Sequence, residues 1–263
     1  MSVKILLLLW LNIVALSVRL LATSMFDGGI GMPSRCPRPG QSFDEDFSSQ
    51  HYGAAELREI MMHDSLRCPM VRKVSIVEDA CKGLLAAFNN IEQLHVSRCV
   101  VDRAVIDVLS VMPLKTLTMF HCRDVASVIS RLPKTIEDLS IGWYGWKGVL
   151  SSLRLILDLP CLRILWLTDC DGIDLRSGLP RDLQVLYITS CKGALLPECL
   201  PPRLTRVTLS DCALNAIPPQ VLALPYLKYL DVSGNAIPEQ EVHNAGGERV
   251  EVTWIAPVVE LKV

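Results

Sequence analysis

Cysteine and histidine are the residues of this chain with the clearest capacity for chemistry. The 263 residues include ten cysteines and five histidines, and a thiolate beside an imidazole can act as a nucleophile or bind a metal ion. His95 is followed by Cys99, and His121 is followed directly by Cys122. These four residues would form a metal site or a cysteine–histidine nucleophile if the local structure turned their side chains toward one another.

A repeated phrase determines how these side chains are directed. Leu-x-x-Leu-x-Leu-x-x-Cys/Asn, with other apolar residues at some leucine positions, occurs seven times between Ile91 and Ile237, and successive copies begin 23, 22, 26, 21, 21 and 23 residues apart. The alternation inside each copy is typical of a short strand with one buried face. One copy cannot bury its own apolar row, so the copies must stack around a common core.

The phrase and its period resemble those of leucine-rich-repeat proteins over about two thirds of the chain, from Val71 to Pro238. The resemblance implies an α/β-type solenoid, or horseshoe, with a parallel sheet of short strands on its concave face and irregular or helical segments on its convex side. Copies ending in cysteine resemble the cysteine-containing repeats of intracellular proteins. The Leu-Pro-x-x-Leu units resemble the repeats of bacterial secreted effectors. The last copy, which ends at Asn235, is similar to surface receptors and cytosolic scaffolds alike, so the resemblance does not specify a role.

The segment before the repeats has two parts. Residues 1–24 carry Lys4 and then an uncharged apolar stretch over 5–18, which is typical of a secretory signal peptide, although Arg19 interrupts the approach to a cleavage site. An uncleaved signal-anchor, a buried cap helix and a misassigned start stay open as alternatives. Residues 25–70 predict a flexible leader and a cap helix with Leu57, Ile60 and Met61 on one side.

We assign residues 71–238 to the repeats, including a degenerate eighth copy that begins at Val71. Residues 239–263 form a C-terminal cap strand or tail, because Val250, Val252 and Trp254 alternate like one more strand.

One position of the repeat forms a structural ladder. The family resemblance implies that the residue at this position turns inward below the strand, where a small thiol or an amide can satisfy backbone groups. We therefore expect packed, reduced thiols rather than disulfides along the ladder. Of the cysteines outside it, Cys36 and Cys68 are the pair to test for a disulfide near the cap. The ladder residues are Cys99, Cys122, Cys170, Cys191, Cys212 and Asn235.

The repeat argues against chemistry at the cysteine–histidine grouping, because Cys99 and Cys122 should face the core whereas His95 should face outward. The chain has no phosphate-binding glycine loop, no Cys-x-x-Cys, no His-Glu-x-x-His and no Gly-x-Ser-x-Gly. A net charge of −2 without a basic stripe makes nucleic acid an unsuitable partner. We therefore predict a protein that is not an enzyme and that carries no cofactor and no metal.

The outward positions of the strands form side-by-side columns, and large aromatic residues gather on consecutive copies. Because exposed aromatic side chains are enriched at binding hot spots, this patch is the predicted partner site. Gly142 would leave a recess beside it. Alternatively, the insertion around Trp143 and Trp146 folds over the sheet and buries the aromatic residues. The predicted partner-binding residues are Phe120, Trp143, Trp166, Tyr187, His95, His121 and Asp169.

These features predict a non-enzymatic module that binds a protein partner through the concave sheet of the repeats. The alternatives are an exported or membrane-tethered structural or receptor-like protein of the cell surface, and a receptor fragment that has lost a signalling domain. The apolar stretch over 5–18 favours a secreted or membrane-anchored location, with membrane association through this segment. The unpaired thiol ladder favours the cytoplasm instead.

Overall fold

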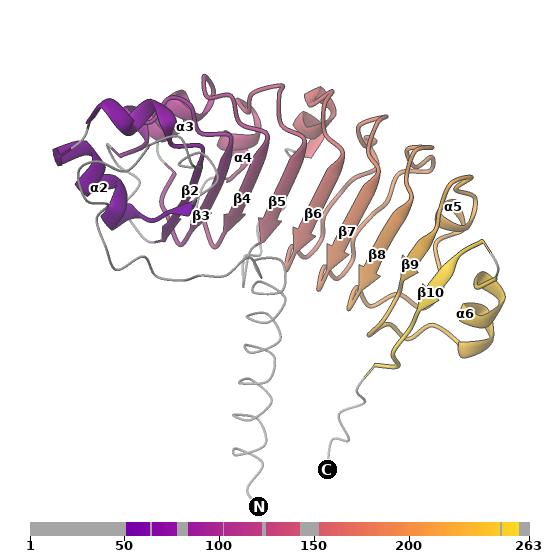
Figure 1. Cartoon of the computed structure of the whole chain (residues 1–263). Helices are drawn as coiled ribbons and strands as arrows, with labels where there is room; N and C mark the ends of the chain where they lie inside the picture. The colour runs from indigo at the N-terminus through magenta and orange to yellow at the C-terminus, as the bar shows by residue number, and fades with distance from the viewer. Residues whose placement is uncertain are drawn as a thin grey trace, which may run out of the picture. The chain divides into compact units, whose positions relative to one another are not determined.

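A computed structural model describes residues 51–63, 65–77, 84–101, 103–122, 125–142, 153–247 and 249–257, all of which belong to one compact unit, Asp46–Val263. The unit is built on a single ten-stranded sheet whose strands lie in chain order and pair in parallel, and which is not closed into a barrel (Figure 1). The strands are β1 (His51–Tyr52), β2 (Lys73–Val77), β3 (Gln93–Ser97), β4 (Thr116–Phe120), β5 (Asp138–Gly142), β6 (Ile164–Thr168), β7 (Val185–Thr189), β8 (Arg206–Ser210), β9 (Tyr229–Asp231) and β10 (Glu251–Thr253).

The strands stay in register because each contributes the same two inward positions to the core. In the five-residue strands, the second and fourth residues are buried, as at Leu165 and Leu167, which are both 0% exposed. Neighbouring strands pair equivalent residues, so Leu139, Leu165 and Leu186 form one continuous row. Since a parallel pair requires a crossover between strands, each copy must return along the other side of the sheet.

Short helices and turns make these returns, and Figure 1 shows them alongside the strands. Apolar residues of the returns, such as Ile106 and Val221, are buried against the inward rows and complete the core. The α-helices are α2 (Ala54–His63), α3 (Arg103–Leu109), α4 (Val125–Ile129), α5 (Pro219–Leu222) and α6 (Glu239–Ala245), and the 3-10 helices are η1 (Ser65–Met70), η3 (Leu85–Ala87) and η4 (Leu153–Asp158).

The two ends of the sheet agree in part with the sequence. A strand is present at the eighth copy, where β2 buries Val74 and Ile76. The predicted cap helix corresponds to α2, but Met61 is 38% exposed, so only Leu57 of its apolar side is fully buried. The short strand β1, which the sequence did not indicate, pairs with β2 ahead of this helix. The tail supplies β10, which pairs with β9, and is preceded by α6. The predicted leader over 1–24 lies outside the described residues.

A left-handed residue ends each of the repeat strands that lead into the ladder. The non-glycine residues at this position have φ between 53° and 56°, a conformation that L-residues rarely adopt. Each donates its backbone N–H to a carbonyl of the following copy at 2.8–3.0 Å, as Arg98 does to Phe120 and Asp169 does to Thr189. This bond offsets the conformational cost and turns the next residue inward. The position is occupied by Arg98, His121, Asp169, Ser190, Asp211 and Gly234.

The inward residue that follows is the ladder cysteine, and its thiol bonds to backbone carbonyls. All five are buried, at 5% exposure or less, and each donates to the carbonyl two residues earlier, as Cys191 does to Thr189 at 3.2 Å. The Cys191 Sγ also accepts the backbone N–H of Cys170 at 3.3 Å. The thiols therefore hydrogen-bond to the backbone of the strand ends as well as filling core volume.

Asn235 performs the same task with a stronger set of bonds. Its Nδ2 donates to the carbonyls of Leu209 at 2.6 Å and Val232 at 2.9 Å, and its Oδ1 accepts the backbone N–H of Cys212 and of Leu214 at 3.0 Å each. Because Asn235 is 0% exposed, water cannot replace the amide as a hydrogen-bond partner if the amide is removed. A buried backbone group left unpaired costs about 1–3 kcal/mol.

We expect Asn235→Ala to lower the free energy of unfolding by about 3 kcal/mol, because it leaves two N–H groups and several carbonyls without partners. Asn235→Cys should lose clearly less, since a thiol serves this position in five other copies. Chemical denaturation measures both changes. Asn244→Ala on the exposed surface of α6 is the control, and equal losses in the alanine and cysteine variants would contradict the role given to the ladder.

Candidate functional site

The open face of the sheet is formed by the side chains that point away from the core. It consists of a leading, a middle and a trailing column, which come from the first, third and fifth residues of the strands. Most side chains of the middle column are half-buried between their neighbours, and Thr208 is 6% exposed. The middle column runs through Ser75, His95, Thr118, Ser140, Trp166, Tyr187, Thr208, Asp231 and Thr253.

Two aromatic residues stack at the centre of the middle column. Trp166 on β6 and Tyr187 on β7 are directly paired in register, and their ring centres are 4.6 Å apart with an interplanar angle of 32°. The indole Nε1 of Trp166 donates to Thr168 Oγ1 at 2.7 Å, which fixes the orientation of the ring. The two rings therefore form a rigid, half-buried platform.

A cation extends this platform across the next two strands. The guanidinium of Arg206 on β8 donates to the Tyr187 hydroxyl at 3.4 Å, and its Cζ lies 4.6 Å from the ring centre of Tyr229 on β9. An arginine over an aromatic ring at this distance is a favourable cation–π contact. We call Trp166, Tyr187, Arg206 and Tyr229 the aromatic row.

Half of the aromatic row was missed by the sequence prediction. The predicted columns began after the first inward leucine of each copy, whereas the residue before that leucine also faces outward. This leading column contains Arg206 and Tyr229, and it places Ile164 and Val185 beside the platform. The strand alternation would have revealed these positions had it been extended by one residue toward the N-terminus.

The predicted patch drew its four aromatic residues from three neighbouring columns, and the structure contradicts only the recess expected at Gly142. Phe120 lies in the trailing column and pairs in register with Gly142, one column away from the middle column that contains Trp166. Its ring covers Gly142, so that a Cβ atom added there would overlap Phe120, and the expected recess is filled. Phe120 packs instead near His95, with ring centres 5.8 Å apart. Trp143 and the insertion that contains Trp146 lie outside the described residues.

His121 and Asp169 lie in the left-handed turns rather than on strands, and this corrects the expectation that they continue the sheet surface. His121 is an exposed residue, but partial burial of its imidazole and the nearby charge of Arg98 lower the imidazole pKa. Burial, assisted by the charge of Asp171, raises the pKa of the Asp169 carboxyl. Both residues border the open face but contact no member of the aromatic row through a hydrogen bond described in this structure.

The four residues of the cysteine–histidine grouping do not converge. Cys99 and Cys122 are 1% and 0% exposed in the core, whereas His95 belongs to the open face and His121 to the turn. Burial raises the pKa of the Cys122 thiol to about 11 and that of the Cys212 thiol to about 12, so both are protonated at neutral pH. In the described part of the chain, no group of three or more His, Cys, Asp or Glu side chains is arranged to hold a metal ion.

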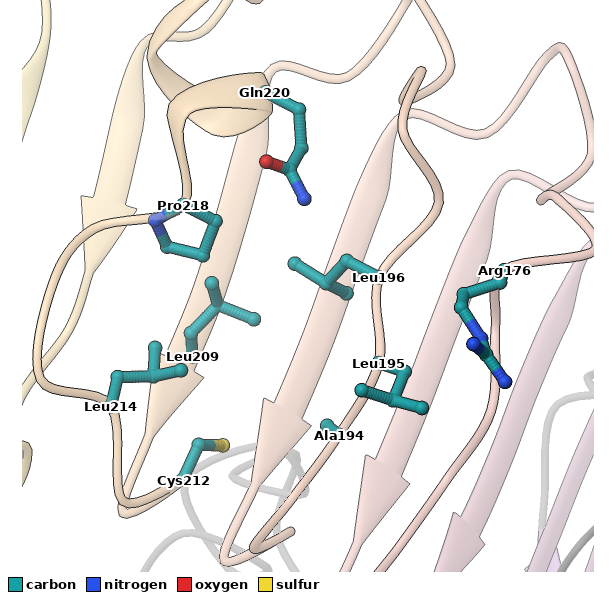
Figure 2. Close-up of a pocket in the computed structure, with 9 residues that line it drawn as sticks. All are labelled: Arg176, Ala194, Leu195, Leu196, Leu209, Cys212, Leu214, Pro218 and Gln220. Atoms are coloured by element: carbon teal, nitrogen blue, oxygen red, sulfur yellow. The ribbon is translucent and has the colours of Figure 1, made fainter.

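A pocket of about 260 Å³ lies on the other side of the sheet, among the returns that follow β6, β7 and β8. Figure 2 shows Leu195, Leu196 and Leu214 around it, with Leu209 and Cys212 reaching in from the core. Its charged residue, Arg176, is already held by two bonds of 2.8 and 3.0 Å to the Asp174 carboxylate. The pocket is thus apolar and offers little to orient a ligand, so we take the open face as the candidate site.

Comparison with protein-family models found none that matches this chain, and comparison with curated proteins found no match either. The site must therefore be interpreted from its own geometry. Among the described residues, no helix has the length and apolar character needed to cross a bilayer.

Asp138 is an unusual member of the leading column. Its Oδ1 is buried and has no hydrogen-bond partner among the described residues, and burial raises the pKa of its carboxyl to about 6. The folded protein consequently holds this proton more tightly than the unfolded chain does. Its ionisation therefore destabilises the fold as the pH rises from about 4 through about 6.

We expect Asp138→Asn to raise the free energy of unfolding by about 1–3 kcal/mol more at pH 7.5 than at pH 4, because the amide cannot ionise. Thermal or chemical unfolding at the two pH values measures this difference. Asp182→Asn, which removes an exposed carboxylate, controls for the loss of one negative charge. A gain that is the same at both pH values would show that burial of the Asp138 charge is not its origin.

Proposed function

We propose that this protein is a leucine-rich-repeat solenoid that binds a protein partner through the concave face of its sheet and does not act as an enzyme. The aromatic row is the single observation that carries the proposal. Its four side chains are contributed by consecutive strands and are held by stacking, a hydrogen bond and a cation–π contact before any partner arrives. Tyrosine, tryptophan and arginine are also the residues most enriched among binding hot spots.

Preorganisation is what suits this row to recognition. Ordering a flexible side chain at an interface costs about 0.5–1.5 kcal/mol, and this cost is reduced when the side chain is already fixed. Trp166 is fixed by Thr168 and by its stacking on Tyr187. Ile164 and Val185 add apolar area next to the rings, so a partner would bury a mixed aromatic and aliphatic surface.

The composition of the row favours binding over catalysis. Its members offer stacking, apolar contact and one cation, and none of the four carries a carboxylate, an imidazole or a thiol. The buried thiols with raised pKa values face the opposite side of the sheet. A protein segment, rather than a small reactive substrate, is the ligand that matches such a surface.

We expect the double variant Trp166→Ala and Tyr187→Ala to abolish capture of the partner in a crosslinking pull-down from the native source. The free energy of unfolding should fall by the contribution of the buried area that is lost, plus only about 0.5–1.5 kcal/mol for the stacking of the two rings. The fall is small because the rings belong to the open face and not to the core. Quantitative mass spectrometry of the captured proteins and thermal unfolding of the variant are the two measurements.

Tyr226→Ala is the matched control, since Tyr226 is 64% exposed and lies outside the open face. It should capture the same proteins as the wild type. Unfolding of the double variant under conditions where the wild type is folded would assign the pair to the core and remove the proposal. Retention of the same captured proteins by the folded double variant would remove it as well.

We also propose that the protein is exported, or tethered to a membrane, by residues 1–24, which carry Lys4 and the apolar stretch over 5–18. This location would accord with a cell-surface structural or receptor-like role, the alternative to a cytoplasmic binding module. Mass spectrometry of the mature amino terminus distinguishes the two. We expect a new terminus near residue 24 or recovery with membranes, and an intact Met1 in a soluble cytosolic fraction would contradict export.

A further inference from the structure

Charge on the open face is divided between its two halves. Over β1–β4 and the left-handed residues that follow β3 and β4, the described ionisable side chains are all basic: His51, Lys73, His95, Arg98 and His121. Over β5–β10 they are mostly acidic: Asp138, Asp169, Arg206, Asp211, Asp231 and Glu251. The aromatic row begins just after the change of sign.

The register brings the basic groups close together. His51 on β1 pairs with Lys73 on β2, and Lys73 pairs with Gln93, two residues before His95 on β3. Neighbouring strands lie about 4.8 Å apart, so side chains at paired positions stand close together. A nearby described carboxylate, Glu92, precedes β3 and is already paired with Lys115 at 2.8 Å and Arg72 at 3.2 Å.

His95 lies at the centre of the basic half, and its surroundings on every side are neutral or cationic among the described residues. Ser75 and Lys73 flank it from β2, and His51 lies beyond them on β1. Thr118 and the ring of Phe120 flank it from β4, and Arg98 and His121 occupy the adjoining turns.

We propose that the basic half binds an acidic segment of the protein partner, a stretch rich in aspartate or glutamate that runs on to an apolar part lying against Trp166 and Tyr187. This inference rests on the proposed function, because it names the chemistry of the partner that the same face would take. Charge complementarity supports it: carboxylates of a partner would meet Lys73, His95 and Arg98, and would be repelled by the acidic half. The division of charge thereby fixes the direction in which the segment lies.

The dimensions of the sheet are compatible with such a segment. Neighbouring strands are about 4.8 Å apart, so the five steps from β2 to β7 cover about 24 Å. An extended peptide rises about 3.3 Å per residue and crosses this distance with roughly seven residues. A short linear stretch can therefore contact both the basic half and the platform.

Binding should depend on pH, with a sign that follows from the imidazoles. Burial and neighbouring cations lower the pKa values of His51, His95 and His121, so these rings are mainly neutral near pH 7. A bound carboxylate favours the protonated ring, and protonation must in turn favour the bound carboxylate, because the coupling is reciprocal. Affinity should therefore rise as the pH falls from 7.5 to 5.5, where glutamates remain ionised.

The test uses fluorescein-labelled peptides of about twelve residues, the length that crosses the face with some excess. One carries a run of glutamates followed by leucine and phenylalanine, and the other has lysines in place of the glutamates. Fluorescence anisotropy with the full chain at pH 7.5 and 5.5 gives the affinities. We expect the glutamate peptide to bind roughly three- to tenfold more tightly at pH 5.5, the lysine peptide to bind more weakly, and added salt to weaken the glutamate complex.

Three variants locate the interaction. Lys73→Gln should weaken binding of the glutamate peptide at both pH values, and His95→Gln should reduce the gain in affinity on acidification, because glutamine has no group that titrates in this range. Lys228→Gln removes a cation outside the open face and should leave binding unchanged. Thermal unfolding of each variant shows whether it is folded at both pH values.

Several outcomes would overturn the inference. Equal binding of the two peptides, absence of binding at pH 5.5, or affinities that Lys73→Gln and His95→Gln leave unchanged would each do so. If the two peptides bind equally but both still require Trp166 and Tyr187, the proposed function stands, and only the preference for an acidic segment fails. If the Trp166 and Tyr187 double variant also keeps the natural partner, both proposals fail. A dimer at pH 5.5 that Lys73→Gln dissociates would make a second copy of this chain the occupant and contradict the inference.

Discussion

The hydrogen bond from each left-handed residue to the following copy is the interaction on which the rest of the structure depends. It places a carbonyl of one strand end opposite the N–H of its neighbour, as between His121 and Gly142 or Ser190 and Ser210. The same turn sends the next side chain into the core, where a thiol or the amide of Asn235 satisfies the surrounding carbonyls. Because the bond is repeated, successive strands begin and end at equivalent residues, and a shift of one residue would expose the whole inward row.

This register also determines which outward side chains can act together. Trp166 and Tyr187 stack because they occupy the same position on adjacent strands. Arg206 reaches both tyrosines because it lies on β8, between β7 and β9, where it pairs in register with Tyr229 and lies one column from Tyr187. Phe120 is only two strands from Trp166, yet it belongs to another column and covers Gly142 instead. Whether two outward side chains contact each other thus depends on their columns as well as on their strands.

Much of this arrangement can be predicted from the spacing of apolar residues. The burial of Leu94 and Val96, and of the thiols, follows from period and alternation alone, because each copy must hide the same positions. The left-handed turns could not be predicted in this way, since Arg98 and Ser190 are not among the residue types that are enriched in such a conformation. The ring of Phe120 over Gly142 depends on a side-chain rotamer, and the buried oxygen of Asp138 depends on its neighbours, neither of which a repeat pattern contains.

The terminal strands have a consequence for how molecules of this protein meet one another. A long unpaired strand would offer its backbone N–H and carbonyl groups to a second chain and allow sheets to join end to end. In the described part of the chain, the first strand has two residues and the last has three, with His51 at one margin and Glu251 at the other. Strands this short and polar present few backbone groups to a second chain, which disfavours the joining of two sheets through β1 or β10.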